Sequence, residues 1–243
     1  MHFSAVGSLA DGLRRTFARN GLVLVLAVSG PFVLSALFSP APIGLQPGMD
    51  GTGTSEPVVG DVAELGWIVT AFTAVSTLYL AIVAYRTFAT DETKTIPREA
   101  IVHRPVWALV NVLLGSIVFA VAVVVGSFLL VVPGLFFLVT LWFFDVFVAV
   151  EDTGFLDGLG ESWSLTAGNR IPLFGLGLVV LLLTMALQLS ISVPLQVYAG
   201  APGLIVGQFA TAVGAVFTFA TTTAAFVRLR RVQGDDDTPA PRR

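Results

Sequence analysis

Residues 105–144 read PVWALVNVLLGSIVFAVAVVVGSFLLVVPGLFFLVTLWFF, 40 consecutive residues without a charged side chain. A bilayer core about 30 Å thick is crossed by about 20 apolar residues in a helix. One continuous helix over this stretch and its flanks would be about 65 Å long, more than any bilayer accommodates. Pro133-Gly134 interrupts the run, because Pro lacks an N–H and Gly accepts left-handed backbone. The stretch therefore predicts a hairpin of two spans with its turn at Pro133-Gly134, rather than a kinked helix.

Three further uncharged runs, at 20–49, 65–85 and 171–227, repeat the pattern. The first two are long enough for one span each, and the third, of 57 residues, for two. We therefore expect an all-α integral membrane protein, with residues 21–227 forming a six-helix transmembrane domain. The predicted spans are about 21–38, 65–86, 106–131, 135–150, 172–193 and 204–227.

The charges assign an orientation to these spans. When the connections are numbered alternately from the N-terminus, every Lys and Arg falls on one side: Arg14, Arg15, Arg19, Arg86, Lys94, Arg98, Arg104, Arg170, Arg228, Arg230, Arg231, Arg242 and Arg243. Cytoplasmic loops of membrane proteins carry the excess of basic residues. The pattern predicts a multi-pass protein of the cell membrane with both termini in the cytoplasm.

Composition excludes several classes of protein. Only 12% of residues are charged, against about 25% in soluble domains. The absence of Cys excludes thiolate chemistry, and His2 and His103, both outside the spans, exclude a histidine-rich metal site within the membrane. A net charge of −3 argues against nucleic acid as a partner. The excess of Arg over Lys, with acid-rich exposed segments, indicates either a halophilic cytoplasm or GC-rich codon usage.

No motif of a membrane enzyme is complete. Val28-Ser29-Gly30 resembles the loop of an intramembrane serine protease but has no histidine in a span to activate it. There is also no Gly-x-x-x-x-Gly-Lys-Ser/Thr loop for a nucleotide. We expect no enzymatic activity, no cofactor and no metal. The expected partners are the lipid bilayer and either other membrane subunits or further copies of this chain.

Two segments outside the spans have helical spacing of apolar residues. In residues 1–20, Phe3, Val6, Leu9, Leu13 and Phe17 predict an interfacial helix. The alternative, a twin-arginine export signal at Arg14-Arg15, is disfavoured because further hydrophobic spans follow.

Within 152–169, the residues Phe155, Leu156, Leu159 and Trp163 share one face and predict an amphipathic elbow helix on the cytoplasmic surface. Asp152 or Thr153 is expected to cap it, and Gly168-Asn169 to end it. The alternative is a solvated loop. Residues 228–243 are expected to form a disordered cytoplasmic tail.

Asp145 is the one charge placed well inside a predicted span. An aspartate at a helix centre costs about 2.5–3.5 kcal/mol, so such a residue needs a partner or a function. One interpretation is a proton or cation site. The other is a structural carboxylate that is either neutralised or paired, with Arg104, Arg170 or Arg228 as the candidate partner.

A motif follows the hairpin: Val148-Ala149-Val150-Glu151-Asp152-x-Gly154, then Gly158-Leu159-x-x-Ser162-Trp163-x-Leu165-x-x-Gly168-Asn169. With Val-Pro-Gly before it, it resembles the membrane domain attached to some glycerophosphodiester phosphodiesterases and its stand-alone, uncharacterised relatives, including halophilic archaeal ones. The resemblance implies the fold and membrane location, with signature positions Pro133, Gly134, Glu151, Ser162, Trp163, Gly168 and Asn169. It does not imply hydrolysis, because the soluble phosphodiesterase domain is missing.

The sequence favours a non-enzymatic scaffold or accessory subunit. The alternative is a permease for a small solute or a lipid-like substrate, with a path among spans three to six. Uncharged polar residues of spans five and six suit either such a path or helix packing: Gln188, Ser190, Ser192, Gln196, Gln208, Thr211 and Thr218.

Overall fold

The computed structural model describes residues 3–38, 63–90, 92–198 and 200–236, and all regular secondary structure in these ranges is helical. Six segments are long and apolar enough to cross a membrane: Arg19–Phe38, Gly66–Ala89, Pro105–Phe128, Val132–Val150, Arg170–Leu195 and Pro202–Gln233. The predicted all-α architecture with six spans is therefore confirmed.

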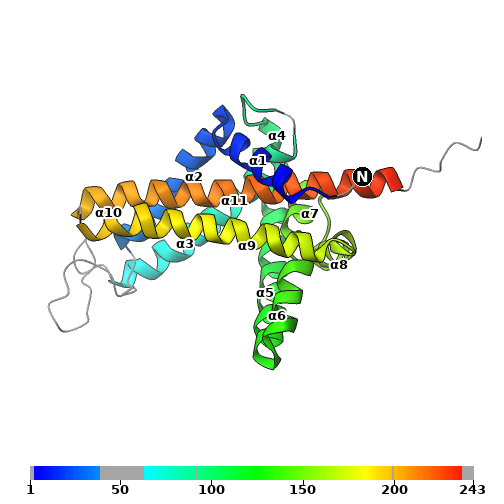
Figure 1. Ribbon diagram of the computed structural model, residues 1–243. Coiled ribbons are helices and arrows are strands. Elements are labelled where there is room, and N and C mark those ends of the chain that lie inside the picture. The colour runs from blue at the N-terminus through cyan, green and yellow to red at the C-terminus, as the bar shows by residue number, and fades with distance from the viewer. Residues whose placement is uncertain (1–2, 39–62, 91, 199, 237–243) are drawn as a thin grey trace, which may run out of the picture.

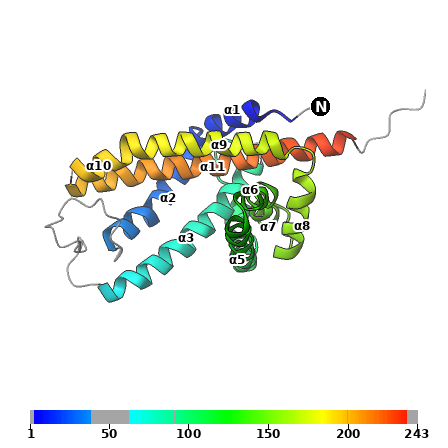
Figure 2. The ribbon, with the colours of Figure 1, turned by 60° about the horizontal axis from the view of Figure 1, so that its bottom comes forward.

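The six spans are arranged as three hairpins that diverge from a common base (Figures 1 and 2). The first pairs α2 (Arg19–Phe38) with α3 (Ala63–Ala89), and the second pairs α5 (Pro105–Leu129) with α6 (Val131–Thr140). The third pairs α9 (Arg170–Leu187), η1 (Gln188–Ser192) and α10 (Val193–Tyr198) with the long α11 (Gly200–Asp236). The base holds α1 (Ala5–Thr16), α4 (Arg98–Val102), α7 (Phe144–Val150) and α8 (Phe155–Thr166).

The base contains the fully buried aromatic side chains, whereas the hairpins are more exposed. The fully buried aromatic side chains Phe88, Phe143 and Phe147 lie near the base, where α11 packs against its neighbours. The hairpins leave large apolar side chains exposed, up to 91% for Phe128 near the tip of α5. Exposed apolar helices whose backbone groups are bonded internally are what lipid contact requires.

Ion pairs connect the charged segments of the base. Arg228 of α11 contacts Asp11 of α1 at 2.6 Å, and Arg230 contacts Glu151, which follows α7. The two ends of the chain's described part, and the connection after α7, therefore lie at one end of the molecule. This agrees with an even number of crossings between them, while the face of the membrane on which they lie stays a prediction.

The predicted position of the second hairpin's turn, at Pro133-Gly134, is wrong. The extended residue is Leu130 (φ −162°), and Pro133 and Gly134 already lie in the first turn of α6. A Pro in a first turn removes only an N–H that has no intrahelical partner. Gly134 instead allows close packing, because a Cβ there would lie 2.8 Å from the Cα of Ser127 on α5.

Three other boundaries differ from the prediction. The N-cap of α8 is Gly154 rather than Asp152 or Thr153, and Asn111 of α5 accepts a hydrogen bond from the Phe155 N–H in place of a local cap. The fifth span does not end at residue 193 as predicted, since the π-turn η1 is followed by α10, which continues through Pro194.

The predicted disordered tail, 228–243, is helical as far as Asp236, because α11 continues through it. Residues 237–243, and residues 39–62 of the connection between the first two predicted spans, lie outside the described residues.

The helix α1 lies within the predicted residues 1–20, and its apolar residues are divided between the core and the surface. The Ser4 hydroxyl caps it by accepting a hydrogen bond from the Gly7 N–H at 3.2 Å. Phe3 and Leu9 pack against the core, whereas Val6, Leu13 and Phe17 are exposed. Exposed apolar side chains beside charged ones are typical of a helix in the headgroup layer.

Candidate functional site

The fourth span is interrupted in its middle. The helix α6 ends at Thr140 and α7 begins at Phe144, with a turn at 141–143 between them. Ser162 of α8 bridges the interruption: its hydroxyl donates to the Thr140 carbonyl at 2.9 Å and accepts from the Phe143 N–H at 3.1 Å. Thr166 donates to the same carbonyl at 3.3 Å. Non-helical backbone at membrane depth persists only where protein satisfies its polar groups, and these two side chains do so.

Asp145 follows directly after this interruption, in the first turn of α7. One carboxylate oxygen accepts a hydrogen bond from the Val146 N–H at 2.9 Å, and the Tyr85 hydroxyl of α3 donates to the carboxylate. Neither contact was predicted, since Tyr85 lies 60 residues before Asp145 in the sequence.

The predicted arginine partners of Asp145 are engaged elsewhere. Arg104 lies over the Trp107 ring at 4.7 Å, Arg170 lies over Phe136 at 4.6 Å, and Arg228 pairs with Asp11. The structural hypothesis of a carboxylate–arginine pair inside the span is therefore wrong. The side-chain partner of Asp145 is the neutral hydroxyl of Tyr85, and no cation of the described residues pairs with its charge.

Asp145 and Tyr85 line a cavity of about 510 Å³ between α2, α3, α7 and α11. Phe32 and Phe219 contribute apolar walls. Thr70, Thr73 and Thr77 lie along one face of α3 in the same cavity, and each donates its hydroxyl proton to a carbonyl of its own helix at 2.7–2.9 Å. Their oxygen lone pairs remain available as acceptors beside the Asp145 carboxylate, and the hydroxyl of Ser35 on α2 also lines the cavity.

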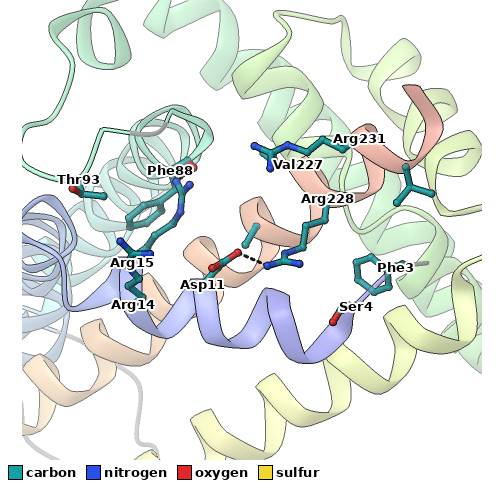
Figure 3. Close-up of a pocket in the computed structure, with 12 residues that line it drawn as sticks. Phe3, Ser4, Asp11, Arg14, Arg15, Phe88, Thr93, Val227, Arg228 and Arg231 are labelled. Atoms are coloured by element: carbon teal, nitrogen blue, oxygen red, sulfur yellow. Dashed lines mark hydrogen bonds and ion pairs between the residues drawn. The ribbon is translucent and has the colours of Figure 1, made fainter. Parts of the chain in front are cut away.

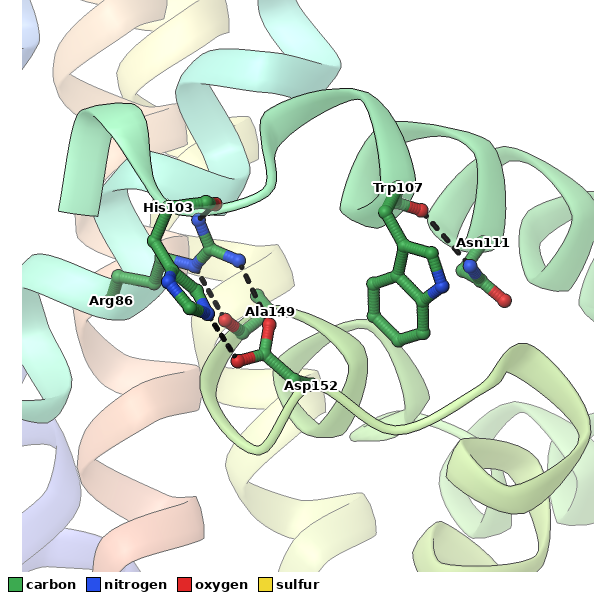
Figure 4. A network of polar contacts seen from close by, with 6 residues as sticks. All are labelled: Arg86, His103, Trp107, Asn111, Ala149 and Asp152. Carbon is green, nitrogen blue, oxygen red and sulfur yellow. Dashed lines mark hydrogen bonds and ion pairs between the residues drawn. The ribbon is translucent and has the colours of Figure 1, made fainter. Parts of the chain in front are cut away.

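The opposite end of α7 is fixed by the buried Arg86, next to Tyr85 on α3. Its guanidinium donates to the carbonyls of Ala149 (2.6 Å) and His103 and to the carboxylate of Asp152 (3.2 Å). Figure 4 shows that His103 approaches the second oxygen of Asp152, at 2.7 Å. The network joins the end of α3 to the links before α5 and after α7. Arg86 lies in the last turn of α3, where its positive charge also complements the helix dipole.

The backbone around this network is unusual. Arg104 and Asp152 both have positive φ, 38° and 53°, a region that non-glycine residues seldom occupy. Such conformations persist where the surroundings hold them, and the bonds from Arg86 and His103 supply that hold. Nothing in the local sequence pattern indicated this network.

The signature residues surround the interruption rather than the cavity. Ser162 bridges the break, and Glu151 accepts from Arg230 at 2.9 Å. Trp163 packs edge-on against Phe136 of α6, with ring centroids 5.3 Å apart.

The remaining signature positions have backbone roles. Gly168 has φ +80° after the end of α8, and Asn169 is the N-cap of α9 without a side-chain cap bond. With Pro133 and Gly134 at the start of α6, these residues shape the connections of spans three to five. Only Asp145, among the predicted site residues, lines the cavity.

The polar residues of spans five and six form a smaller contact. Thr211 donates to the side-chain oxygen of Gln188 at 3.1 Å, beside a cavity of about 230 Å³. This pair joins η1 to α11, so it packs the third hairpin. Within the described residues, no group of three His, Asp or Glu side chains is arranged to hold a metal ion.

These observations define a helical, membrane-like protein with six potential spans and an interrupted fourth one. The chain belongs to the family DUF7847, a domain of unknown function, whose model matches residues 3–229. The match includes α1 and most of α11, so both helices and the base between them are part of the family's domain. No curated protein and no solved structure matches the chain. The resemblance to the membrane domain of glycerophosphodiester phosphodiesterases, and a halophilic archaeal origin, stay predictions.

Proposed function

We propose that this chain is a non-enzymatic permease of the cell membrane that carries a small cationic or amine-bearing solute, or a lipid-like molecule with such a group, through the cavity at Asp145. The observation that carries the proposal is the composition of the cavity: a carboxylate with no cationic partner among the described residues, beside hydroxyl oxygens of Thr70, Thr73 and Thr77 that act as acceptors. Intramembrane carboxylates that face a cavity mark ion or substrate pathways.

The interrupted span supports the same proposal. Transporters place their binding sites where transmembrane helices are discontinuous, because unwound backbone and half-helices provide polar groups at membrane depth. Here the interruption at 141–143 directly precedes Asp145. The predicted path among spans three to six is revised accordingly, since the cavity also involves spans one and two through Phe32 and Thr73.

The alternative is a scaffold or accessory subunit without transport. The contacts of Arg104, Arg170 and Arg228 contradict the paired form of the structural hypothesis, and a neutralised structural carboxylate belongs to this alternative. For both the permease and the scaffold, we propose that the two termini lie in the cytoplasm. We also propose that the chain associates with other subunits or with further copies of itself.

Flux measurements on reconstituted protein separate the two functions. Liposomes containing the purified protein are tested for uptake of radiolabelled methylammonium and ethanolamine, and for movement of a fluorescent aminophospholipid. We expect Asp145→Asn to abolish flux while thermal stability in detergent is retained, because the amide still accepts from Tyr85. The matched variant Asp157→Asn changes an exposed carboxylate on α8 and should transport normally.

Two results oppose the proposal. Flux that is no greater than in empty liposomes for every probe favours the scaffold. Flux that is unchanged in Asp145→Asn excludes the cavity as its path.

A further inference from the structure

A second cavity, of about 430 Å³, lies in the base between α1, the end of α3 and the end of α11. Figure 3 shows arginines from two helices around the same opening: Arg14 and Arg15 from α1, and Arg228 and Arg231 from α11. Asp11 is the acidic residue among those that line the cavity. Four guanidinium groups against one carboxylate make this cavity strongly cationic.

The four arginines that line this cavity differ in the hydrogen bonds and ion pairs that they make within the protein. Arg15 donates to the carbonyls of Phe88 and Thr90 at the end of α3, and Arg228 pairs with Asp11 at 2.6 Å. Arg14 and Arg231 have no hydrogen bond or ion pair within the part of the chain that the structure describes. The buried Nε of Arg228 also lacks a partner there. The cavity therefore retains donors for an anion after its internal contacts are formed.

The packing of α1 leaves this space open. Gly7 faces Arg228, and a Cβ at that position would lie 2.6 Å from a guanidinium nitrogen. Gly12 lets α1 approach α11, since a Cβ there would lie 2.8 Å from the Cα of Thr221. The two glycines bring the helices together without filling the cavity between them.

The exposed apolar residues of α1 place the cavity relative to lipid. Val6, Leu13 and Phe17 share an exposed face, while Asp11 and Arg14 lie on the adjacent face that lines the cavity. An interfacial helix buries its apolar face at the boundary between headgroups and acyl chains. The cavity on the neighbouring face then lies at the depth of the headgroups.

We propose that this cavity binds the phosphate group of an anionic lipid headgroup. Guanidinium groups bind phosphate oxygens through paired charge-assisted hydrogen bonds, and basic pockets between transmembrane helices bind anionic headgroups. Arg14 and Arg231 provide guanidinium donors without a partner among the described residues, and Arg228, which pairs with Asp11, adds its guanidinium to the same cavity. The hydroxyls of Ser4 and Thr93 lie at its edge. The apolar face of α1 favours a lipid over a free phosphate. The proposal is independent of transport through the Asp145 cavity.

Native mass spectrometry of the full chain, with phosphatidylglycerol and phosphatidylcholine added to the detergent solution, tests the proposal. The wild-type protein should retain phosphatidylglycerol in preference to phosphatidylcholine. In Arg14→Gln/Arg231→Gln the affinity for phosphatidylglycerol should fall about tenfold or more, since each basic residue near headgroups contributes several-fold to binding. Thermal stability should not change, because neither side chain has a hydrogen-bond or ion-pair partner among the described residues.

The matched control is Arg19→Gln/Arg98→Gln, which removes the same charge from exposed positions outside the cavity. If this control loses as much lipid, the attraction is due to general charge and the proposed site is wrong. Equal retention of phosphatidylcholine by the wild type also overturns it. A further arm adds inorganic phosphate: displacement of the lipid at millimolar concentration would mean that the cavity takes a free phosphate, which overturns the assignment to lipid. The single variants Arg14→Gln and Arg231→Gln provide the same readout if the double variant does not fold.

Discussion

The change Ser162→Ala tests whether α8 holds the interrupted fourth span. The substitution removes the hydroxyl that accepts from the Phe143 N–H and donates to the Thr140 carbonyl. Ser162 is fully buried, so water cannot replace it. A buried polar group left without a partner costs about 1–3 kcal/mol. The Thr140 carbonyl keeps its bond from Thr166, whereas the Phe143 N–H loses its side-chain partner.

We therefore expect a loss of about 2–3 kcal/mol in the free energy of unfolding, most of it from the Phe143 N–H. An ordinary polar contact between membrane helices contributes only about 0.6 kcal/mol, so the two interpretations differ enough to be separated. The assay is denaturant unfolding of the purified protein in detergent micelles, followed by circular dichroism. Ser164→Ala is the matched control, because Ser164 is exposed on the same helix and should change stability by less than about 0.5 kcal/mol.

The double variant Ser162→Ala/Thr166→Ala adds a second criterion. It leaves the Thr140 carbonyl without either hydroxyl donor, so its loss of stability should exceed the sum of the two single losses. If Ser162→Ala and Ser164→Ala are equally stable, or if the losses simply add, Ser162 does not hold the interruption in the way described.

Three further predictions concern packing, topology and the elbow helix. Gly134→Ala should lower stability by about 1–3 kcal/mol, because its Cβ would press against Ser127, whereas Gly160→Ala, with open space around it, should not destabilise. Cysteines introduced singly at Thr52 and Gln233 should differ in labelling by an impermeant thiol reagent on intact cells, position 52 reacting and position 233 not; equal labelling would contradict the orientation. The fluorescence of Trp163, which is 42% exposed beside Phe136, should be quenched by brominated lipids in a variant that lacks the other tryptophans, Trp67, Trp107 and Trp142. An absence of quenching would place α8 away from the membrane.

The extent of the helices could be predicted because it depends on quantities that are local in sequence. Uncharged runs of about 20 residues and the distribution of arginines are sufficient for six spans. The position of the second turn was wrong because Pro133 was interpreted as a helix breaker. Pro is equally typical of a helix start, where its missing N–H has no consequence, and that signal favours a turn just before Val131.

The candidate site could be predicted only in part, because its contacts join distant segments. The rarity of a charge in a span was enough to identify Asp145, but its partner Tyr85 depends on how α3 packs against α7. The motif included Ser162 without indicating its role, since no local rule relates it to the carbonyl of Thr140, 22 residues earlier. The cationic cavity was missed for the same reason: Arg14 and Arg231 come from opposite ends of the chain.

The short helix α7 connects these findings. A helix of 7 residues has too few internal hydrogen bonds to be stable alone, so its position is set by its neighbours. Ser162 holds the residue before it through the Phe143 N–H, and Arg86 holds its last turn through the Ala149 carbonyl. Asp145 lies between these two anchors and is directed toward Tyr85 and the cavity. The orientation of the carboxylate therefore depends on the positions of both α8 and α3.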